Sequence, residues 1–212
     1  MGEDRVKLPR LYAIVDVNGL GRRSSDTSAV VNFARELAAG GVTLIQYRSK
    51  KSDARTMLYH AREIRQKLKS EVTLIMNDRA DLCLAADFDG VHVGQDDLSP
   101  EGARRVVGPQ RIVGVSTHNL EQLARADASP ADYIAFGPIF TTSAKENPDP
   151  VVGLEGLRAA RAATAKPLVA IGGITRVNVR SVLDAGADSV AVISDLVTSP
   201  RQAAEAFLRL MV

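Results

Sequence analysis

The chain is poor in cysteine, in net charge and in long apolar runs, and each shortage excludes a class of protein. Cys83 is the only cysteine, so an intrachain disulfide and a cysteine-rich zinc site are both excluded. The 27 basic and 25 acidic residues leave a net charge of +2, which gives no reason to expect nucleic acid or an anionic membrane as a partner. No apolar stretch approaches membrane-spanning length, and the charged segment from Met1 to Pro9 lacks an apolar signal region, so we expect a cytoplasmic protein.

The sequence does contain enough apolar material for one sizeable core. Hydrophobic residues make up 45% of the 212, a length that suits one compact domain and leaves little room for a second. No linker, low-complexity segment or block of charge marks a boundary, so we expect residues 1–212 to form a single catalytic domain. Cys83 lies in the apolar run Leu82-Cys83-Leu84, which predicts a small buried residue rather than a nucleophile.

Short β-branched runs alternate along the chain with longer stretches rich in Ala, Leu, Arg and Glu. The first kind is typical of strands covered on both faces, as in parallel sheets, and the second of amphipathic helices. The predicted strands are Leu11–Asp16, Leu44–Arg48, Thr73–Asn77, Gly90–Val93, Arg111–Val115, Tyr133–Gly137, Leu168–Ile171 and Ser189–Ile193. The predicted helices lie near residues 27–39, 53–69, 79–86, 99–106, 119–127, 154–164, 176–184 and 200–211.

Eight strand–helix units in series predict an α/β protein of the single (β/α)8 TIM barrel type, with right-handed crossovers and the helices outside. An open doubly wound sheet is the main alternative, but eight strands is wide for that fold and no Gly-x-Gly-x-x-Gly follows the first strand. The loop at residues 141–153 is long and follows the sixth strand. We therefore expect it to be a lid over the face that carries catalytic residues in barrels.

Polar residues in period two follow the apolar part of the second strand. Alternation along a strand places Gln46, Arg48 and Lys50 on one side, at the catalytic end. Arginine and lysine together suit a polyanion such as a diphosphate. The alternative is a set of ordinary basic residues at a strand end, and we favour function because three polar residues share the pattern.

Acidic residues end the third and fourth strands. Asn77-Asp78 and Asp96-Asp97 follow neighbouring strands, which lie roughly 5 Å apart, so their carboxylates can share one ion. Oxygen ligands beside a basic phosphate cradle predict Mg²⁺ bridged by substrate phosphates. Taken separately, Asn77 or Asp78 could simply cap the third helix, and Asp96 and Asp97 could form a turn.

The fifth, seventh and eighth strands end in residues suited to hydrogen bonding and anion binding. Ser116 can bind substrate or cap the fifth helix. Gly172-Gly173 and Ser194 stand where barrels build a phosphate site from backbone N–H groups. Two anion sites therefore predict two phosphorylated substrates, or one substrate with widely spaced phosphates.

The three histidines give no sign of nucleophilic catalysis. His92 lies within a strand and is expected to be buried and hydrogen-bonded to a neighbour. His60 is expected on the outside of the second helix, and His118 is a candidate for the rim of the site.

Taken together, these motifs resemble the thiamine-phosphate synthase family over nearly the whole chain and in the right order. The family's Gln-x-Arg-x-Lys corresponds to Gln46, Arg48 and Lys50, its Asn-Asp to Asn77-Asp78 and its Gly-Gln-x-Asp to residues 94–97. Its Gly-Val-Ser, Gly-Pro-Ile-Phe, Gly-Gly-Ile and Ile-Ser motifs stand at residues 114–116, 137–140, 172–174 and 193–194.

The resemblance implies that hydroxymethylpyrimidine diphosphate is joined to thiazole phosphate or its carboxylate, with release of pyrophosphate. It implies Mg²⁺ on Asp78 and Asp97. The pyrimidine diphosphate site would comprise Gln46, Arg48, Lys50, Asn77, Ser116 and Lys145, of which Arg48, Lys50, Ser116 and Lys145 act in catalysis. The thiazole phosphate site would comprise Thr142, Ser143, Ala144, Gly173, Ile193 and Ser194.

One residue departs from the family pattern. The family's lid commonly reads Pro-Thr-x-Thr-Lys, whereas residues 141–145 read Thr-Thr-Ser-Ala-Lys, so Ala144 lacks an expected hydroxyl. Three other functions are compatible with a phosphate-binding barrel: a thiazole tautomerase, a non-catalytic thiamine-precursor-binding protein and a phosphosugar isomerase. The diphosphate and metal residues favour the synthase over the tautomerase and the isomerase, and Ala144 is the only feature that favours the non-catalytic protein. A homo-oligomer is compatible with the sequence.

Overall fold

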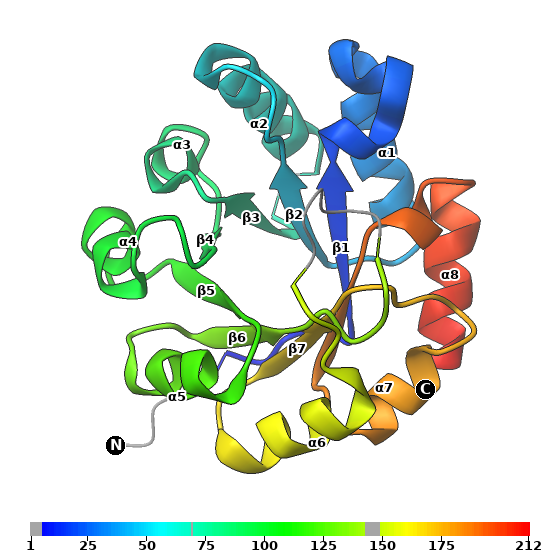
Figure 1. Ribbon diagram of the computed structural model, residues 1–212. Coiled ribbons are helices and arrows are strands. Elements are labelled where there is room, and N and C mark those ends of the chain that lie inside the picture. The colour runs from blue at the N-terminus through cyan, green and yellow to red at the C-terminus, as the bar shows by residue number, and fades with distance from the viewer. Residues whose placement is uncertain (1–5, 69, 143–148) are drawn as a thin grey trace.

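The computed structural model describes residues 6–68, 70–142 and 149–212. Its strands pair in parallel and in sequence order, and the last pairs with the first to close a barrel (Figure 1). The strands are β1 (Leu11–Asp16), β2 (Leu44–Arg48), β3 (Thr73–Asn77), β4 (Gly90–Val93), β5 (Ile112–Thr117), β6 (Tyr133–Phe136), β7 (Leu168–Ile171) and β8 (Ser189–Val192). The predicted (β/α)8 barrel is confirmed.

An α-helix follows each strand and lies outside the ring of strands (Figure 1). The helices are α1 (Thr27–Ala39), α2 (Ala54–Leu68), α3 (Ala80–Ala85), α4 (Pro100–Val107), α5 (Leu120–Ala128), α6 (Gly153–Ala163), α7 (Val179–Asp184) and α8 (Pro200–Leu210). Two 3-10 segments follow β1 and β8: η1 (Val17–Ser25), which is kinked at Gly21, and η2 (Ser194–Leu196). Among the described residues, none of the helices is long and apolar enough to cross a bilayer.

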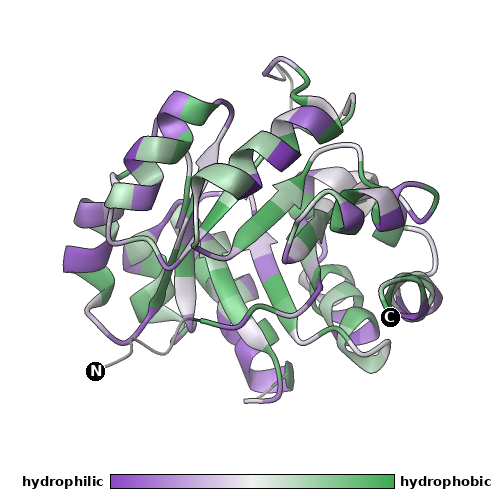
Figure 2. Ribbon diagram, turned by 90° about the horizontal axis from the view of Figure 1, so that it is seen from below, coloured by the Kyte–Doolittle hydropathy of each residue, from purple (hydrophilic) through white to green (hydrophobic). Residues whose placement is uncertain are grey.

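The core divides into two regions because every strand is covered on both faces. The larger region packs the outward side chains of the strands against the helices, whose outer faces are hydrophilic (Figure 2). The smaller region fills the barrel interior with Tyr12, Ile14, Leu44, Ile75, Tyr133, Ala135, Val169 and Ala191. This filling makes the barrel a packed core rather than a pore, so a ligand must bind at one of its ends.

Most element boundaries follow the sequence prediction, and the differences occur at turns. Two helices begin at side-chain caps: Ser99 accepts a hydrogen bond from Gly102 N at 3.1 Å, and Asn119 accepts one from Gln122 N at 2.9 Å. Strand β5 extends beyond its predicted end because Ser116 and Thr117 pair with β6. Ser116 therefore lies within a strand and does not cap α5. The 3-10 helices were not predicted.

Candidate active site

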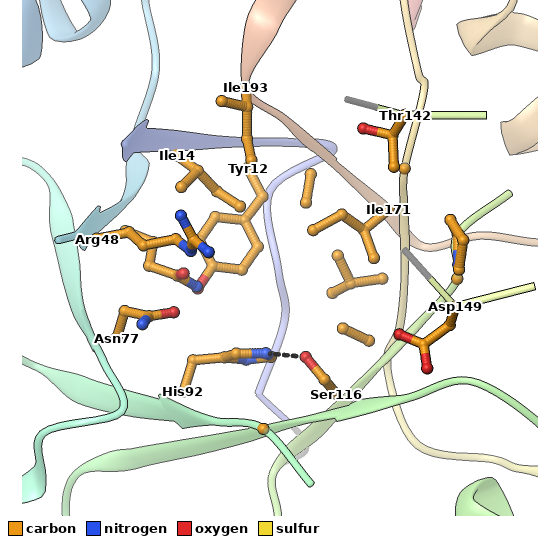
Figure 3. Close-up of a pocket in the computed structure, with 18 of the residues that line it drawn as sticks. Tyr12, Ile14, Arg48, Asn77, His92, Ser116, Thr142, Asp149, Ile171 and Ile193 are labelled. Atoms are coloured by element: carbon orange, nitrogen blue, oxygen red, sulfur yellow. Dashed lines mark hydrogen bonds between the residues drawn. The ribbon is translucent and has the colours of Figure 1, made fainter. Parts of the chain in front are cut away.

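A cavity of about 500 Å³ lies at the carboxyl ends of the strands, and barrel-interior residues such as Ile14 (Figure 3) line it from below. Of the predicted site residues it brings together Gln46, Arg48, Lys50, Asn77, Asp78, Asp97, Ser116, Thr142, Gly173, Ile193 and Ser194. Ser143, Ala144 and Lys145 lie outside the described residues.

The basic side of the cavity comes from strand β2 and the residues after it. Gln46, Arg48 and Lys50 all line the cavity, as the alternation of side chains along a strand requires. Arg48 Nη1 lies 3.0 Å from the Oδ1 atom of Asp16, a buried carboxylate at the end of β1. Lys50 Nζ lies 2.5 Å from Asp78 Oδ2. The two cations are thus held at the cavity by carboxylates of the neighbouring strand ends.

Asp78 occupies a tight turn directly after β3. Its φ of 61° is in the left-handed region, which is rare for a residue other than glycine, and Arg79 N donates to Asn77 O across it at 2.8 Å. The N-cap of α3 is Arg79, without a side-chain cap bond, so the alternative that Asn77 or Asp78 caps this helix is wrong. The turn instead directs the Asp78 carboxylate into the cavity.

Asp78 and Asp97 form an acidic pair. Burial raises the pKa of Asp78 above its ordinary value and the neighbouring Asp97 carboxylate raises it further, against the lowering effect of Lys50. Asp97 Oδ2 also accepts a hydrogen bond from Gly94 N at 2.9 Å, so it closes the predicted turn as well. A divalent cation between the carboxylates would relieve their repulsion.

The two carboxylates suit an Mg²⁺ ion that takes its other ligands from the substrate, rather than a metal bound by protein side chains alone. In the part of the chain that the structure describes, His, Cys, Asp and Glu side chains form no cluster of three or more suited to a metal. Two carboxylates with further oxygens from substrate phosphates are a common way for proteins to bind Mg²⁺. Asp78 and Asp97 are therefore the residues that could hold such an ion.

Asn77 contributes an unpartnered amide to the same side of the cavity. Its side chain is 6% exposed, and its Nδ2 atom has no hydrogen-bond partner among the described residues. Buried polar groups are normally hydrogen-bonded, so an unpaired donor that faces a cavity indicates a ligand contact (Figure 3).

A hydrogen-bonded chain of five side chains crosses the cavity floor. Gln46 Nε2 lies 2.8 Å from Tyr12 OH, which lies 2.8 Å from Tyr133 OH. Tyr133 OH lies 2.9 Å from His92 Nδ1. His92 Nε2 lies 2.8 Å from Ser116 Oγ (Figure 3). We call these residues the tyrosine–histidine network. Burial lowers the pKa of His92 to about 4 and raises those of both tyrosines, so all three are uncharged near neutral pH.

The loops after β7 and β8 form a second wall. Both Gly172 (φ 101°) and Gly173 (φ 63°) have backbone conformations that favour glycine. A Cβ atom on Gly172 would lie 2.5 Å from Pro138 Cβ, and one on Gly173 would lie 2.5 Å from Thr141 O. The glycine pair therefore also allows the β6 and β7 loops to pack closely. This second requirement for glycine at both positions could not be predicted from the sequence.

Asp195 ties the β7 loop to the β8 loop. Its carboxylate accepts hydrogen bonds from Arg176 N at 2.8 Å, Nε at 3.0 Å and Nη2 at 2.8 Å. Burial alone would raise the pKa of Asp195, but the bonds from Arg176 lower it below its ordinary value. This contact fixes the position of Ser194 and Gly173 relative to each other.

Thr142, His118 and Asp149 lie at the rim of the cavity. His118 is at the rim as predicted: its Nδ1 donates to Gly137 O at 2.7 Å, and its Nε2 lies 3.4 Å from Asp149 Oδ2. Asp149 belongs to the predicted lid, of which residues 143–148 lie outside the described part of the chain.

The sequence also led to predictions about the burial of His60 and Cys83, which lie away from the cavity. His60 was expected outside, but it is 1% exposed and hydrogen-bonded through Nδ1 to Tyr47 OH at 3.0 Å. It is buried because Tyr47 points outward from β2 and its hydroxyl needs a partner under α2. Cys83 is buried as expected, and burial raises its pKa to about 12.

Sequence reasoning missed Asp16, Tyr12 and Tyr133. The last residue of β1 was not considered with the other strand ends, although the same rule would have identified Asp16. Tyr12 and Tyr133 lie in the first part of their strands and gave no such signal, because their contacts depend on the stagger of β1, β4 and β6 around the barrel.

The arrangement combines groups for two anions. Two cations, a buried amide and an acidic pair gather on the β2, β3 and β4 side, while the glycine pair and Ser194 supply backbone and hydroxyl donors on the β7 and β8 side. Such a cavity suits the transfer of a group that leaves behind a diphosphate, with a phosphorylated acceptor bound opposite.

Comparison with known proteins agrees with this chemistry. The sequence profile described as "Thiamine monophosphate synthase" matches residues 11–196. The chain is 64% identical over 206 residues to the thiamine-phosphate synthase of Koribacter versatilis, with 97% of each chain covered. It is 45% identical over 191 residues to that of Chloroflexus aurantiacus, with 90% of this chain and 86% of the relative covered.

A solved structure gives the same result. The thiamine phosphate pyrophosphorylase of Pyrococcus furiosus superposes with a TM-score of 0.83 at 35% identity, covering 95% of this chain and 94% of the other. The profile match includes all the strand ends described above, and the two relatives cover 97% and 90% of this chain. The chain therefore belongs to the thiamine monophosphate synthase family.

Proposed function

We propose that the chain joins hydroxymethylpyrimidine diphosphate to thiazole phosphate, or its carboxylate, in thiamine biosynthesis. The bond between the pyrimidine methylene carbon and the diphosphate oxygen breaks, and pyrophosphate leaves with the electron pair. The thiazole nitrogen then forms a bond to that carbon, which gives thiamine phosphate. When the acceptor is the carboxylate, its carboxyl group is also lost as carbon dioxide, and the electron pair of the broken carbon–carbon bond stays on the thiazole ring. The observation that carries the proposal is the convergence of Arg48, Lys50, Asp78 and Asp97 on one cavity.

The leaving diphosphate is bound by the basic side of the cavity. Arg48 and Lys50 hold its oxygens and stabilise the charge that develops as the bond breaks, and Lys145 of the lid joins them. Asp78 and Asp97 would hold Mg²⁺, which when bound neutralises charge on the diphosphate. Lys50 contacts Asp78, and it would turn to the substrate when Asp78 holds the ion.

The pyrimidine lies against the floor and the thiazole phosphate against the opposite wall. Gln46, Asn77 and Ser116 orient the pyrimidine through hydrogen bonds, and the aminopyrimidine delocalises the positive charge on its methylene carbon. The thiazole phosphate is held by Thr142, Ser143, Ala144, Gly173, Ile193 and Ser194. No protein nucleophile is needed, because positioning and exclusion of water protect the cation until the thiazole attacks.

The same proposal covers the setting of the reaction. Residues 1–212 act as one catalytic domain on small molecules, in the cytoplasm, without nucleic acid or membrane.

The test is to mix both substrates with Mg²⁺ and to measure thiamine phosphate and pyrophosphate, which should appear in equal amounts. Asp97→Asn should lower turnover by about 10²-fold or more, because one ligand of the ion is lost. Glu101→Gln, an exposed carboxylate change on α4, should leave turnover unchanged. An Asp97→Asn enzyme with normal turnover at limiting Mg²⁺ would contradict the metal assignment, and a wild type that forms no thiamine phosphate would contradict the function.

A further inference from the structure

The tyrosine–histidine network has a direction that follows from counting its hydrogens. Four of its five members are buried: Tyr12, Tyr133, Gln46 and His92 are between 0% and 7% exposed, whereas Ser116 is partly exposed. Each hydroxyl has one hydrogen to donate, a neutral imidazole has one N–H and one acceptor nitrogen, and an amide nitrogen can only donate. Because unpaired buried donors are rare, the hydrogens must be arranged so that each finds an acceptor.

The count starts at Gln46, whose Nε2 atom faces Tyr12. Tyr12 accepts this bond and has Tyr133 as the acceptor for its own hydrogen. Tyr133 in turn donates to His92 Nδ1, which must therefore be the unprotonated nitrogen. The ring proton of His92 is then on Nε2 and is donated to Ser116 Oγ.

The two ends of the network face the cavity, one as a hydrogen-bond donor and the other as an acceptor. Ser116 accepts from His92, so its own hydrogen is left to point into the cavity as a donor. Gln46 uses its nitrogen on Tyr12, so its carbonyl oxygen is left to face the cavity as an acceptor. A planar heterocycle with an exocyclic amino group and ring nitrogens, such as an aminopyrimidine, matches one acceptor and one donor placed in this way.

The rings that carry the network are fixed by packing. Tyr133 stacks on His92 with ring centroids 5.5 Å apart at 24°, and meets Tyr12 edge-on at 5.9 Å and 76°. Gly114 makes room for this arrangement, because a Cβ atom there would lie 2.0 Å from Tyr133 Cζ. The glycine of the Gly-Val-Ser motif thus serves the ring of Tyr133.

We propose that Tyr133 is a positioning residue that holds His92 in the Nε2–H tautomer and so makes Ser116 a hydrogen-bond donor to the substrate. The inference rests on the proposed function for the identity of that substrate, but the tautomer itself is a property of the protein alone. If the Gln46 amide had the opposite orientation, every bond in the network would be reversed and the proton would be on Nδ1. The tautomer of His92 therefore distinguishes the two orientations of the Gln46 amide.

The first test is ¹⁵N NMR of the imidazole rings in the full-length wild type without substrate. The His92 signals should show protonated Nε2 and unprotonated Nδ1. In Tyr133→Phe, which keeps the ring and removes the donor, the His92 signals should shift towards a mixture of tautomers. An Nδ1–H tautomer in the wild type, or unchanged His92 signals in the variant, would overturn the proposal.

Kinetics of the same variant form the second test. Tyr133→Phe should lower kcat about tenfold, less than Ser116→Ala, with the KM for thiazole phosphate unchanged. In a Ser116→Ala background it should have almost no further effect, since residues that act through one another are not additive. Additive losses, or wild-type turnover in Tyr133→Phe, would contradict the positioning role.

Tyr47→Phe is the matched control. Tyr47 is also a buried tyrosine hydrogen-bonded to a histidine, His60, but it points away from the cavity. This variant should alter the His60 signals and leave the His92 signals and kcat unchanged. If the wild type forms no thiamine phosphate while His92 shows the Nε2–H tautomer, the proposed function fails and the hydrogen-bond direction stands.

Discussion

Burial of His92 couples its protonation state to folding. In the unfolded chain the imidazole titrates near pH 6.5, whereas burial lowers the pKa of the folded state to about 4. Because the pKa of His92 is lower in the folded state, the neutral side chain makes its full contribution to the free energy of unfolding above pH 6.5. That contribution is lost as the pH falls towards 4, because the unfolded state takes up the proton first.

We therefore expect the free energy of unfolding to fall between pH 7 and pH 5 by about 2 kcal/mol more in the wild type than in His92→Gln. Chemical denaturation of both proteins at the two pH values measures the difference. His60→Gln is a useful comparison, because burial lowers that pKa as well. An identical pH dependence in the wild type and His92→Gln would show that burial does not lower the pKa of His92 in the folded state.

Individual site residues could be predicted from the sequence where a local rule fixes their direction. Gln46, Arg48 and Lys50 share one side because strands alternate, whatever the rest of the fold does. The contact between Tyr133 and His92 could not be predicted in this way, because the two residues are on strands that are not neighbours. Asp78 was found by its position, but its left-handed turn was not, since nothing local requires it of an aspartate.

At the scale of elements, the loops after β7 and β8 act as one unit through Arg176 and Asp195. Arg176→Ala should raise the KM for thiazole phosphate several-fold, because Gly173 and Ser194 lose the contact that holds their loops together. The kcat should change less, since the diphosphate side of the cavity is untouched. Steady-state kinetics with each substrate varied in turn measures both effects.

Arg158→Ala is the control for this experiment, because it removes a surface ion pair with Glu155 on α6 that has no part in the cavity. It should leave both KM values unchanged. A larger effect of Arg176→Ala on the KM for the pyrimidine diphosphate than on that for thiazole phosphate would contradict the assignment of this wall.

Element boundaries were predictable where hydrophobic patterning is strong. The eight strands are buried apolar runs, and five of them begin and end at the predicted residues. The helices η1 and η2 were missed because short 3-10 segments have no periodic signal. The predicted start of α7 near residue 176 was wrong: it begins at Val179, since Arg176 is held in the preceding loop by Asp195.

At the scale of the whole molecule, closure of the barrel creates the site. Pairing of β1 with β8 places Asp16 and Arg48 on the same rim as the loops after β7 and β8, although almost 150 residues separate Arg48 from Ile193 in the sequence. The count of strand–helix units was enough to predict the barrel. The acidic pair and its basic neighbours were predictable as a group, but their distances depend on closure.

The proposed function requires Asp78 and Asp97, beside Arg48 and Lys50, to bind a diphosphate together with a divalent ion. This requirement can be tested by calorimetric titration of the protein with inorganic pyrophosphate, with and without Mg²⁺. We expect Mg²⁺ to tighten pyrophosphate binding to the wild type at least about tenfold, and we expect this gain to be lost in Asp97→Asn. Equal affinities with and without Mg²⁺ in the wild type, or an undiminished gain in Asp97→Asn, would contradict it.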